Sequence, residues 1–173
     1  MNDLADRIAG EIPRLRRYAR ALLRSETEAD DLVQECVLRG LAKQHLWQEG
    51  TDLRAWLFTI LHNQFVNNVR RAAREGTSVK ISDLDGDTPE FPAQEKRLEL
   101  RDLDRALSLL PDEQRTLIFL IGLEGMDYES AGKIVGVPVG TVRSRLSRAR
   151  VALRQLMGIK SDSAAETKEA EAA

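Results

Sequence analysis

Apolar residues recur every three or four positions along almost all of this 173-residue chain, and that spacing most restricts its fold. It is the spacing of one face of an α-helix, whereas a half-buried strand would alternate strictly, and no sustained alternation occurs. The helical pattern lapses between Gly76 and Gln94, where Gly, Asp, Ser, Thr and Pro predominate. We therefore expect an all-α fold class, with two small helical domains joined by a flexible linker.

The lapse in the pattern sets the expected domain boundaries. The first domain covers residues 1–75, the acidic linker 76–94 and the second domain 95–158. The polar tail, 159–173, has no apolar face, so we expect it to be disordered. Within the first domain, helices are expected over 12–23, from Ser25 onward, and over 53–74. Ser25 followed by Glu28 has the spacing of a capping box, in which each residue satisfies a free donor at a helix start.

One segment departs from the mild acidity of the chain, whose formal net charge is −2. The run VGTVRSRLSRAR begins at Val139, and residues 136–158 contain five arginines and no carboxylate. A helical wheel gives this segment one apolar stripe, formed by Val142, Leu146, Ala149, Leu153 and Leu156. Ser144 and Arg148 lie opposite that stripe with Ser147 nearby, and further arginines lie on both flanks. Such a helix suits the major groove of DNA, because its crest can contact bases while its flanks contact phosphates.

The residues before the basic run strengthen that interpretation. MDYESAGKIVGVPVGTV predicts a short helix, a turn at Gly136–Gly140 and then the basic helix, which together form a helix-turn-helix. The small Gly132 allows the two helices to approach closely. The alternative is an arginine-rich helix that is merely solvated, and the spacing of the preceding helix and turn argues against it.

At these residues the chain resembles the extracytoplasmic-function (ECF) sigma factors of bacterial RNA polymerase. VGTVRSRLSRAR is similar to the GTVxSRLxRAR signature of their −35-reading domain. EADDLVQECVLRGL resembles the segment that binds the polymerase clamp helices, and LRAWLFTILHNQFVNNVRR resembles the −10 melting segment. The resemblance covers residues 10–75 and 95–156 in the family's order. It implies a sigma factor that directs RNA polymerase core to promoters, and no enzymatic activity.

The resemblance also implies roles for particular residues. The −35 contacts would come from Thr141, Arg143, Ser144, Ser147 and Arg148. The −10 contacts would come from Asn63, Trp56, Arg70 and Arg71, with Phe65 helping Trp56 to frame a pocket for an unstacked base. Two alternatives remain open here. Asn63 could be a solvated amide, and arginines at a helix C-terminus, Arg74 among them, also complement the helix dipole.

In the family, the second helix of the first domain contacts the β′ clamp helices of polymerase. The matching polar residues are Asp30, Asp31, Gln34 and Glu35, which pair at i,i+4 spacing and so form one acceptor patch. The sequence alone favours a solvated amphipathic face for these residues, and only the surrounding motif favours a polymerase contact. Cys36 is expected to be a small buried residue with no reactive thiol.

The resemblance implies several partners: the β′ clamp helices and β flap of RNA polymerase core, promoter DNA, and an anti-sigma factor. LPDEQR, LIGLEGMDYESA and PRLRRYARALL resemble the EcfG-like general stress-response group, whose regulator is a small NepR-like protein. We expect a cytoplasmic protein with no membrane insertion and no cofactor. We also expect no metal site, since Cys36, His45 and His62 are its only cysteine and histidines. The principal alternative is a sigma mimic that sequesters an anti-sigma factor. A stand-alone helix-turn-helix repressor would leave the first domain unexplained.

Overall fold

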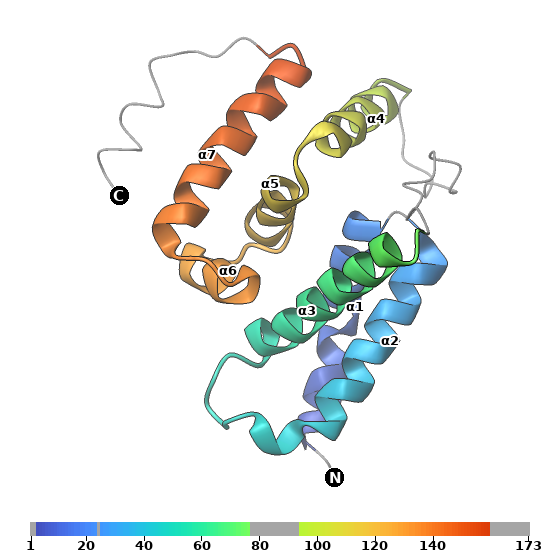
Figure 1. The fold of residues 1–173 in the computed structure, drawn as a ribbon, viewed down its shortest axis with the longest axis vertical. Coiled ribbons are helices and arrows are strands. Elements are labelled where there is room, and N and C mark those ends of the chain that lie inside the picture. The colour runs from blue at the N-terminus through green and yellow to red at the C-terminus, as the bar shows by residue number, and fades with distance from the viewer. Residues whose placement is uncertain (1–2, 24, 77–93, 160–173) are drawn as a thin grey trace.

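The computed structural model describes residues 3–23, 25–76 and 94–159, and within those ranges the chain is helical without any strand (Figure 1). The all-α prediction is therefore confirmed. Three long helices, α1–α3, form what we call the first lobe, and α4–α7 form the second lobe. Most of the predicted linker and nearly all of the predicted tail lie outside the described residues.

The first lobe consists of α1 (Asp3–Leu23), α2 (Glu26–Ala42) and α3 (Leu53–Arg74), with a 3-10 turn, η1 (Gln44–Leu46), after α2. Ser25 caps α2 by accepting a hydrogen bond from the Glu28 N–H at 3.3 Å, as the sequence predicts. Asp52 caps α3 through the Ala55 N–H at 3.1 Å. The three helices bury one apolar core, to which each of them contributes (Ile8, Leu15, Tyr18, Ala29, Leu32, Cys36, Leu57, Phe58, Leu61).

Helix α1 begins nine residues before the predicted start at Ile12. Pro13 lies inside the helix, although a proline removes one backbone donor and disfavours a helix interior. In the fold, Ile8 is fully buried and Leu4 packs against the same core. Burial of these side chains offsets the cost of the proline, so tertiary packing decides where this helix begins.

The second lobe contains α4 (Gln94–Leu109), α5 (Asp112–Leu117), a π-helical turn η2 (Ile118–Leu123), α6 (Tyr128–Val135) and α7 (Val139–Leu156). Asp127 caps α6 by accepting the Ser130 N–H at 2.7 Å, and this bond keeps the pKa of its carboxyl below the usual range. Gly136 ends α6 in the left-handed conformation, with φ of 74°. The predicted helix-turn-helix is thus present, with its second helix beginning at Val139.

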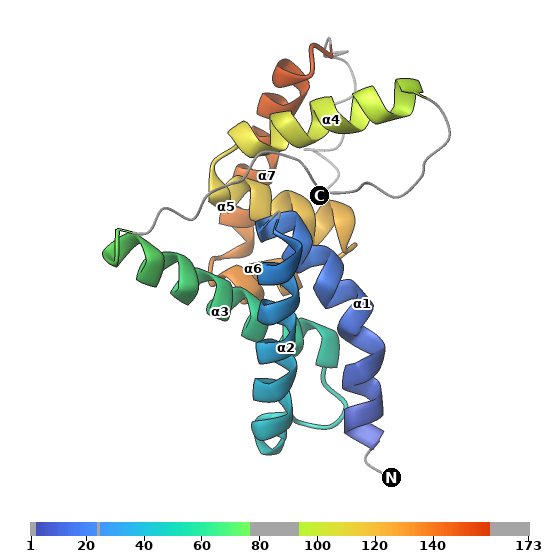
Figure 2. The ribbon, with the colours of Figure 1, turned by 90° about the vertical axis from the view of Figure 1, so that its right-hand side faces the viewer.

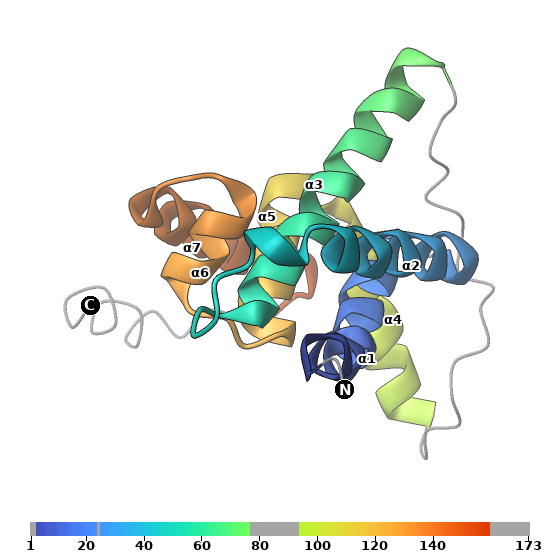
Figure 3. The same cartoon turned by 90° about the horizontal axis from the view of Figure 1, so that it is seen from below.

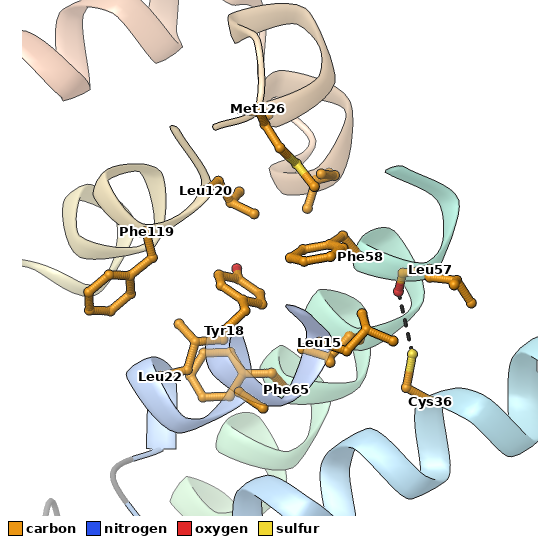
Figure 4. Close-up of a cluster of buried hydrophobic side chains, with 14 of the residues drawn as sticks. Leu15, Tyr18, Leu22, Cys36, Leu57, Phe58, Phe65, Phe119, Leu120 and Met126 are labelled. Carbon is orange, nitrogen blue, oxygen red and sulfur yellow. Dashed lines mark hydrogen bonds between the residues drawn. The ribbon is translucent and has the colours of Figure 1, made fainter. Parts of the chain in front are cut away.

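The two lobes pack directly against each other. Helix α3 contacts α6, and η2 contacts α1 (Figures 1 and 2). As a result the buried core is continuous from one lobe to the other, and Phe119, Leu120 and Met126 of the second lobe meet Tyr18 and Phe58 of the first (Figure 4). The sequence predicted two domains but did not predict this contact.

Candidate nucleic-acid interface

Close packing between α6 and the start of α7 holds the helix-turn-helix together. A Cβ built on Gly132 would lie 2.8 Å from the Val137 carbonyl oxygen and 3.3 Å from a methyl of Val142. Only glycine therefore allows the turn to approach α6 this closely. Pro138 precedes α7, and its carbonyl accepts the Thr141 and Val142 N–H groups at 2.9 and 3.1 Å. These contacts orient α7 relative to the rest of the lobe.

The outer face of α7 carries the residues for which a −35 role is implied. Arg143, Ser144, Ser147 and Arg148 are exposed, whereas Thr141 at the start of the helix is half-buried. The Arg148 Nε donates to the Ser144 carbonyl at 3.2 Å, so the guanidinium lies over this face. On the opposite side Val142, Leu146 and Ala149 are fully buried. The predicted crest is a solvent-facing surface of small polar and basic side chains.

Two details of α7 differ from the wheel. Leu156, expected in the apolar stripe, is 47% exposed because the helix ends there beyond the reach of the core. Arg145, expected to flank the groove and contact phosphate, instead pairs with Glu113 of α5 at 2.9 Å. Its side chain is only 25% exposed, so its charge is already partly neutralised within the protein.

Helix α3 carries the candidate −10 residues on one stripe. Trp56, Asn63 and Arg70 are spaced by seven residues, which places them on the same side of a helix. Asn63 and Arg70 are exposed and Trp56 is half-buried against Gly40 of α2. Asn67, one turn after Asn63, is also exposed, and its spacing could have drawn attention to it from the sequence. The C-terminal half of α3 projects beyond the other helices (Figure 3).

Phe65 does not belong to this stripe. Its side chain is 9% exposed and lies in the core beside Leu22 and Tyr18 (Figure 4). Along α3, Arg54, Phe58, Leu61 and Phe65 follow i, i+4, i+7, i+11 spacing, opposite Trp56 and Asn63 at about 100° per residue. The expected pocket framed jointly by Trp56 and Phe65 is therefore wrong.

The four polar residues of α2 do not form one free patch. Asp31 and Gln34 are exposed. Asp30 pairs with Arg16 of α1 at 2.9 Å, and Glu35 pairs with Arg39 at 2.8 Å. The Gln64 amide also hydrogen-bonds to Glu35, and together with Arg39 it lowers the pKa of that carboxyl.

A groove of about 370 Å³ between α2 and α3 connects two of the predicted sites. Asp31 and Glu35 line it from α2, and Arg71 lines it from the end of α3. Arg71 thus lies beside the acidic residues of α2 as well as near Arg70. Beneath this surface Cys36 is buried, its thiol donates to the Leu57 carbonyl at 3.4 Å, and burial raises its pKa to about 12. Cys36 is a structural residue, as predicted.

Comparisons with known proteins match both helical lobes to sigma factor domains. Residues 8–62 match the family model described as the Sigma2 domain of PhyR, and residues 100–153 match Sigma-70, region 4. The chain is 41% identical to the ECF RNA polymerase sigma factor EcfG of Rhodopseudomonas palustris over 90% of its own length and 86% of that protein. The chain belongs to the extracytoplasmic-function family of RNA polymerase sigma factors, which confirms the resemblance found in the sequence.

Two solved structures resemble the fold across both lobes. One is the sigma factor RpoE of Bartonella quintana in complex with the anti-sigma factor NepR (TM-score 0.77, 37% identity), covering 93% of this chain and all of that one. The other is CnrH in complex with the cytosolic domain of CnrY (TM-score 0.66, 26% identity), covering 90% and 88% of the two chains. Within the residues that the structure describes, no helix is long and apolar enough to cross a membrane.

Proposed function

We propose that this protein directs bacterial RNA polymerase core to promoters by contacting the −35 and −10 elements with its second and first lobes. The observation that carries this proposal is the outer face of α7, where Arg143, Ser144, Ser147 and Arg148 are solvated above a buried apolar stripe. A helix of this kind that follows a short helix and tight turn can enter a major groove. Membership of the sigma factor family supports the same conclusion.

In this proposal residues 1–75 bind polymerase and the −10 element, 76–94 act as the linker, and 95–158 bind the −35 element. On α7, Arg143 and Arg148 contact phosphate or guanine edges, and Ser144, Ser147 and Thr141 contribute short polar contacts. On α3, Asn63 holds an unstacked base beside Trp56, and Arg70 and Arg71 contact the backbone. On α2, Asp31 and Gln34 face the β′ clamp helices, and Asp30 and Glu35 do so through carboxylates that already have arginine partners.

The proposal extends to regulation and location. The chain's likeness to EcfG and to the RpoE of the NepR complex supports a NepR-like anti-sigma factor as its regulator, in a general stress response. The protein would act in the cytoplasm, where polymerase and DNA are found, and the β flap of polymerase would contact the second lobe. Recruitment and base trapping involve no covalent chemistry, so the protein acts as a transcription factor and has no catalytic residue.

A second candidate function has one observation in its favour. The first lobe matches a domain described from PhyR, and the anti-anti-sigma factor PhyR of Bartonella quintana, solved in complex with the anti-sigma factor NepR, has a similar fold. A sigma mimic would bind an anti-sigma factor without reading promoters. The solvated arginines of α7 and the C-terminal arginines of α3 favour the sigma factor, because a mimic does not need them.

Run-off transcription tests the proposal. Core polymerase from a bacterium with an EcfG-type sigma factor is mixed with this protein and a pool of promoter fragments, and the transcripts are sequenced. We expect initiation at promoters that share a −35 and a −10 sequence, and loss of those transcripts with Asn63→Ala or Arg148→Ala. Arg101→Ala, at an exposed arginine of α4 to which no DNA contact is assigned, is the matched control and should transcribe normally.

Two other outcomes would contradict the proposal. Binding to core without any specific transcript would contradict the roles assigned to α3 and α7. No binding to core, together with tight binding to a purified NepR protein, would establish the sigma mimic instead.

A further inference from the structure

The ion pair between Arg145 and Glu113 lies at the edge of the candidate DNA surface of α7. Arg145 precedes Arg148 by three residues, so the two side chains occupy neighbouring positions on that helix. Glu113 belongs to the first turn of α5, which packs against α7 (Figure 1). The Arg145 Nη2 lies 2.9 Å from the Glu113 Oε2. A carboxylate therefore lies beside the helix that is proposed to contact DNA.

Two carboxylates begin α5, and they have different partners. Asp112 pairs with Arg115 of the same helix at 2.6 Å, and that arginine is buried. Glu113 pairs across to α7 instead. The Pro111 carbonyl accepts the Arg115 N–H at 3.0 Å, which closes the helical turn that carries both acids. The start of α5 therefore holds Glu113 next to Arg145.

The pair matters little for the stability of the fold. The Glu113 side chain is 67% exposed and that of Arg145 is 25% exposed, and water screens ion pairs of this kind. Its effect on a polyanion is larger, because every protein cation that pairs with a DNA phosphate releases a counterion. An arginine that stays with Glu113 makes no such contact, and the exposed carboxylate repels a phosphate that approaches the same flank.

The two flanks of α7 consequently differ in charge. Arg143 and Arg150 are seven residues apart, so they lie on one flank, and both are exposed. On the other flank the positive charge beside Arg148 is neutralised, because Arg145 is paired. Phosphate contacts supply essentially all of the affinity for unrelated DNA, whereas base contacts add the part that depends on sequence. Pairing of Arg145 lowers the first contribution and leaves Arg148 available for the second.

We propose that Glu113 is a specificity-determining residue, which holds Arg145 away from DNA phosphates and so limits the binding of α7 to unrelated sequences. The inference rests on the proposed function, because it assumes that the outer face of α7 contacts DNA. On a promoter, Arg148 contacts the −35 element while Arg145 stays with Glu113. Specificity is a ratio of affinities, so weaker binding to the wrong sequences raises it as effectively as stronger binding to the right one.

Binding of the full chain to a fluorescent duplex of random sequence tests this role. Anisotropy titrations at roughly 50 to 200 mM KCl give the Kd and its dependence on salt. Glu113→Gln removes the charge and nearly preserves the size of the side chain, and it should lower the Kd at the lowest salt at least about threefold. The plot of log binding constant against log salt concentration should become steeper by about 0.9, the value for one additional phosphate contact.

A double variant separates the release of Arg145 from a simple change in net charge. In an Arg145→Gln background, Glu113→Gln should leave the salt dependence unchanged, because no arginine is released. Glu99→Gln is the matched control, since it removes the same charge at an exposed position of α4, and it should also leave the salt dependence unchanged. Equal steepening in both backgrounds, or with Glu99→Gln, would overturn the proposal. Circular dichroism checks that each variant remains helical.

Holoenzyme measures the consequence for promoters. A promoter found by run-off transcription competes with random duplex for core polymerase loaded with the parent or with Glu113→Gln. The ratio of promoter binding to random binding should fall at least about threefold in the variant, and an unchanged ratio would overturn the specificity role. If Glu113→Gln binds random duplex exactly as the parent does, Glu113 has no such role, and the proposed function stands. If neither protein binds DNA at the lowest salt, the DNA surface assigned to α7 fails, and the inference fails with it.

Discussion

Helices α3 and α7 carry the two candidate DNA-contacting surfaces, and they are built alike but connected differently. Each has a buried apolar stripe and, opposite it, a solvated stripe with arginine and small polar residues. The buried stripe of α7 is covered by α5, α6 and α4 of its own lobe. The buried stripe of α3 is covered by α1 and α2 and also by α6 of the other lobe.

The comparison shows that two candidate DNA-contacting faces can be equally exposed to solvent and still differ in how firmly their helices are held by the rest of the protein. The outer face of α7, proposed to contact a −35 element, is supported by helices of its own lobe. Asn63 on α3 is exposed, but the position of α3 relative to α7 is set by the contacts of Glu124 with Arg17 and Arg54 and by the apolar contact around Phe58. We therefore expect changes on α7 to act locally and changes on α3 to depend also on the packing of α3 against the second lobe.

The largest effect is expected from Arg148→Ala. Loss of a guanidinium that contacts a base or phosphate costs about 2 kcal/mol, which corresponds to roughly thirtyfold weaker −35-dependent transcription. Binding to core polymerase should not change, because Arg148 lies on the solvent side of α7, away from the candidate polymerase residues of α2. Run-off transcription and a core-binding titration measure the two effects. Normal transcription by this variant would show that the outer face of α7 is not the −35 surface.

Gly132→Ala tests whether α7 depends on the packing of its own lobe. The added Cβ would lie 2.8 Å from the Val137 carbonyl oxygen, so the turn must shift, at a cost of about 2 kcal/mol in the free energy of unfolding. Thermal unfolding followed by circular dichroism measures this cost. Gly140→Ala is the control, because nothing lies within 4 Å of its Cβ and alanine favours a helix. Equal stability of the two variants would contradict the close approach of α6 and α7.

Acidification should act on the lobe that contains α3. Burial lowers the pKa of His62 to about 4 from 6.5, and its Nδ1 lies 3.4 Å from the Tyr18 hydroxyl. Between these two pKa values the unfolded chain binds more protons than the folded one, so stability decreases as the pH falls through that window, by on the order of 2 kcal/mol.

Urea unfolding between pH 7 and pH 4.5 measures that loss, with His62→Gln as the comparison. The variant should lose markedly less stability over the same range, because it has no imidazole to protonate. A parallel decline in both proteins would assign the effect to carboxyl groups instead, of which Glu35 and Asp127 have lowered pKa values.

The smallest effect is expected from Arg145→Ala. Its ion pair with Glu113 is partly exposed, so the free energy of unfolding should fall by about 0.5 kcal/mol or less. Transcription should change far less than with Arg148→Ala, since Arg145 is held against α5. An equally large loss of transcription would mean that Arg145 leaves Glu113 to bind DNA.

Periodicity was sufficient for most of the helices and for the inner and outer faces of α7, but not for the start of α1. Val142, Leu146 and Ala149 are buried where the wheel places them, and Ser144 and Arg148 are exposed. These predictions succeed because they depend on interactions between residues three or four apart, which the sequence displays directly. Phe65 is in the core, as its helical spacing predicts, but the pocket that it was expected to frame with Trp56 is wrong because that expectation used proximity along the chain instead of direction around the helix.

The buried ion pairs of Glu124 could not be predicted from the sequence. In LIGLEGMDYESA it is one acidic residue before a glycine, with no spacing that sets it apart. Its partners are 107 and 70 residues away, so only the packing of α1, α3 and η2 brings Arg17 and Arg54 to it. Helices, caps and amphipathic faces were determined by local sequence, because their energetics are local. The closure of the two lobes was decided by the tertiary structure, because it depends on burying one carboxylate and a few apolar side chains from segments that the sequence keeps far apart.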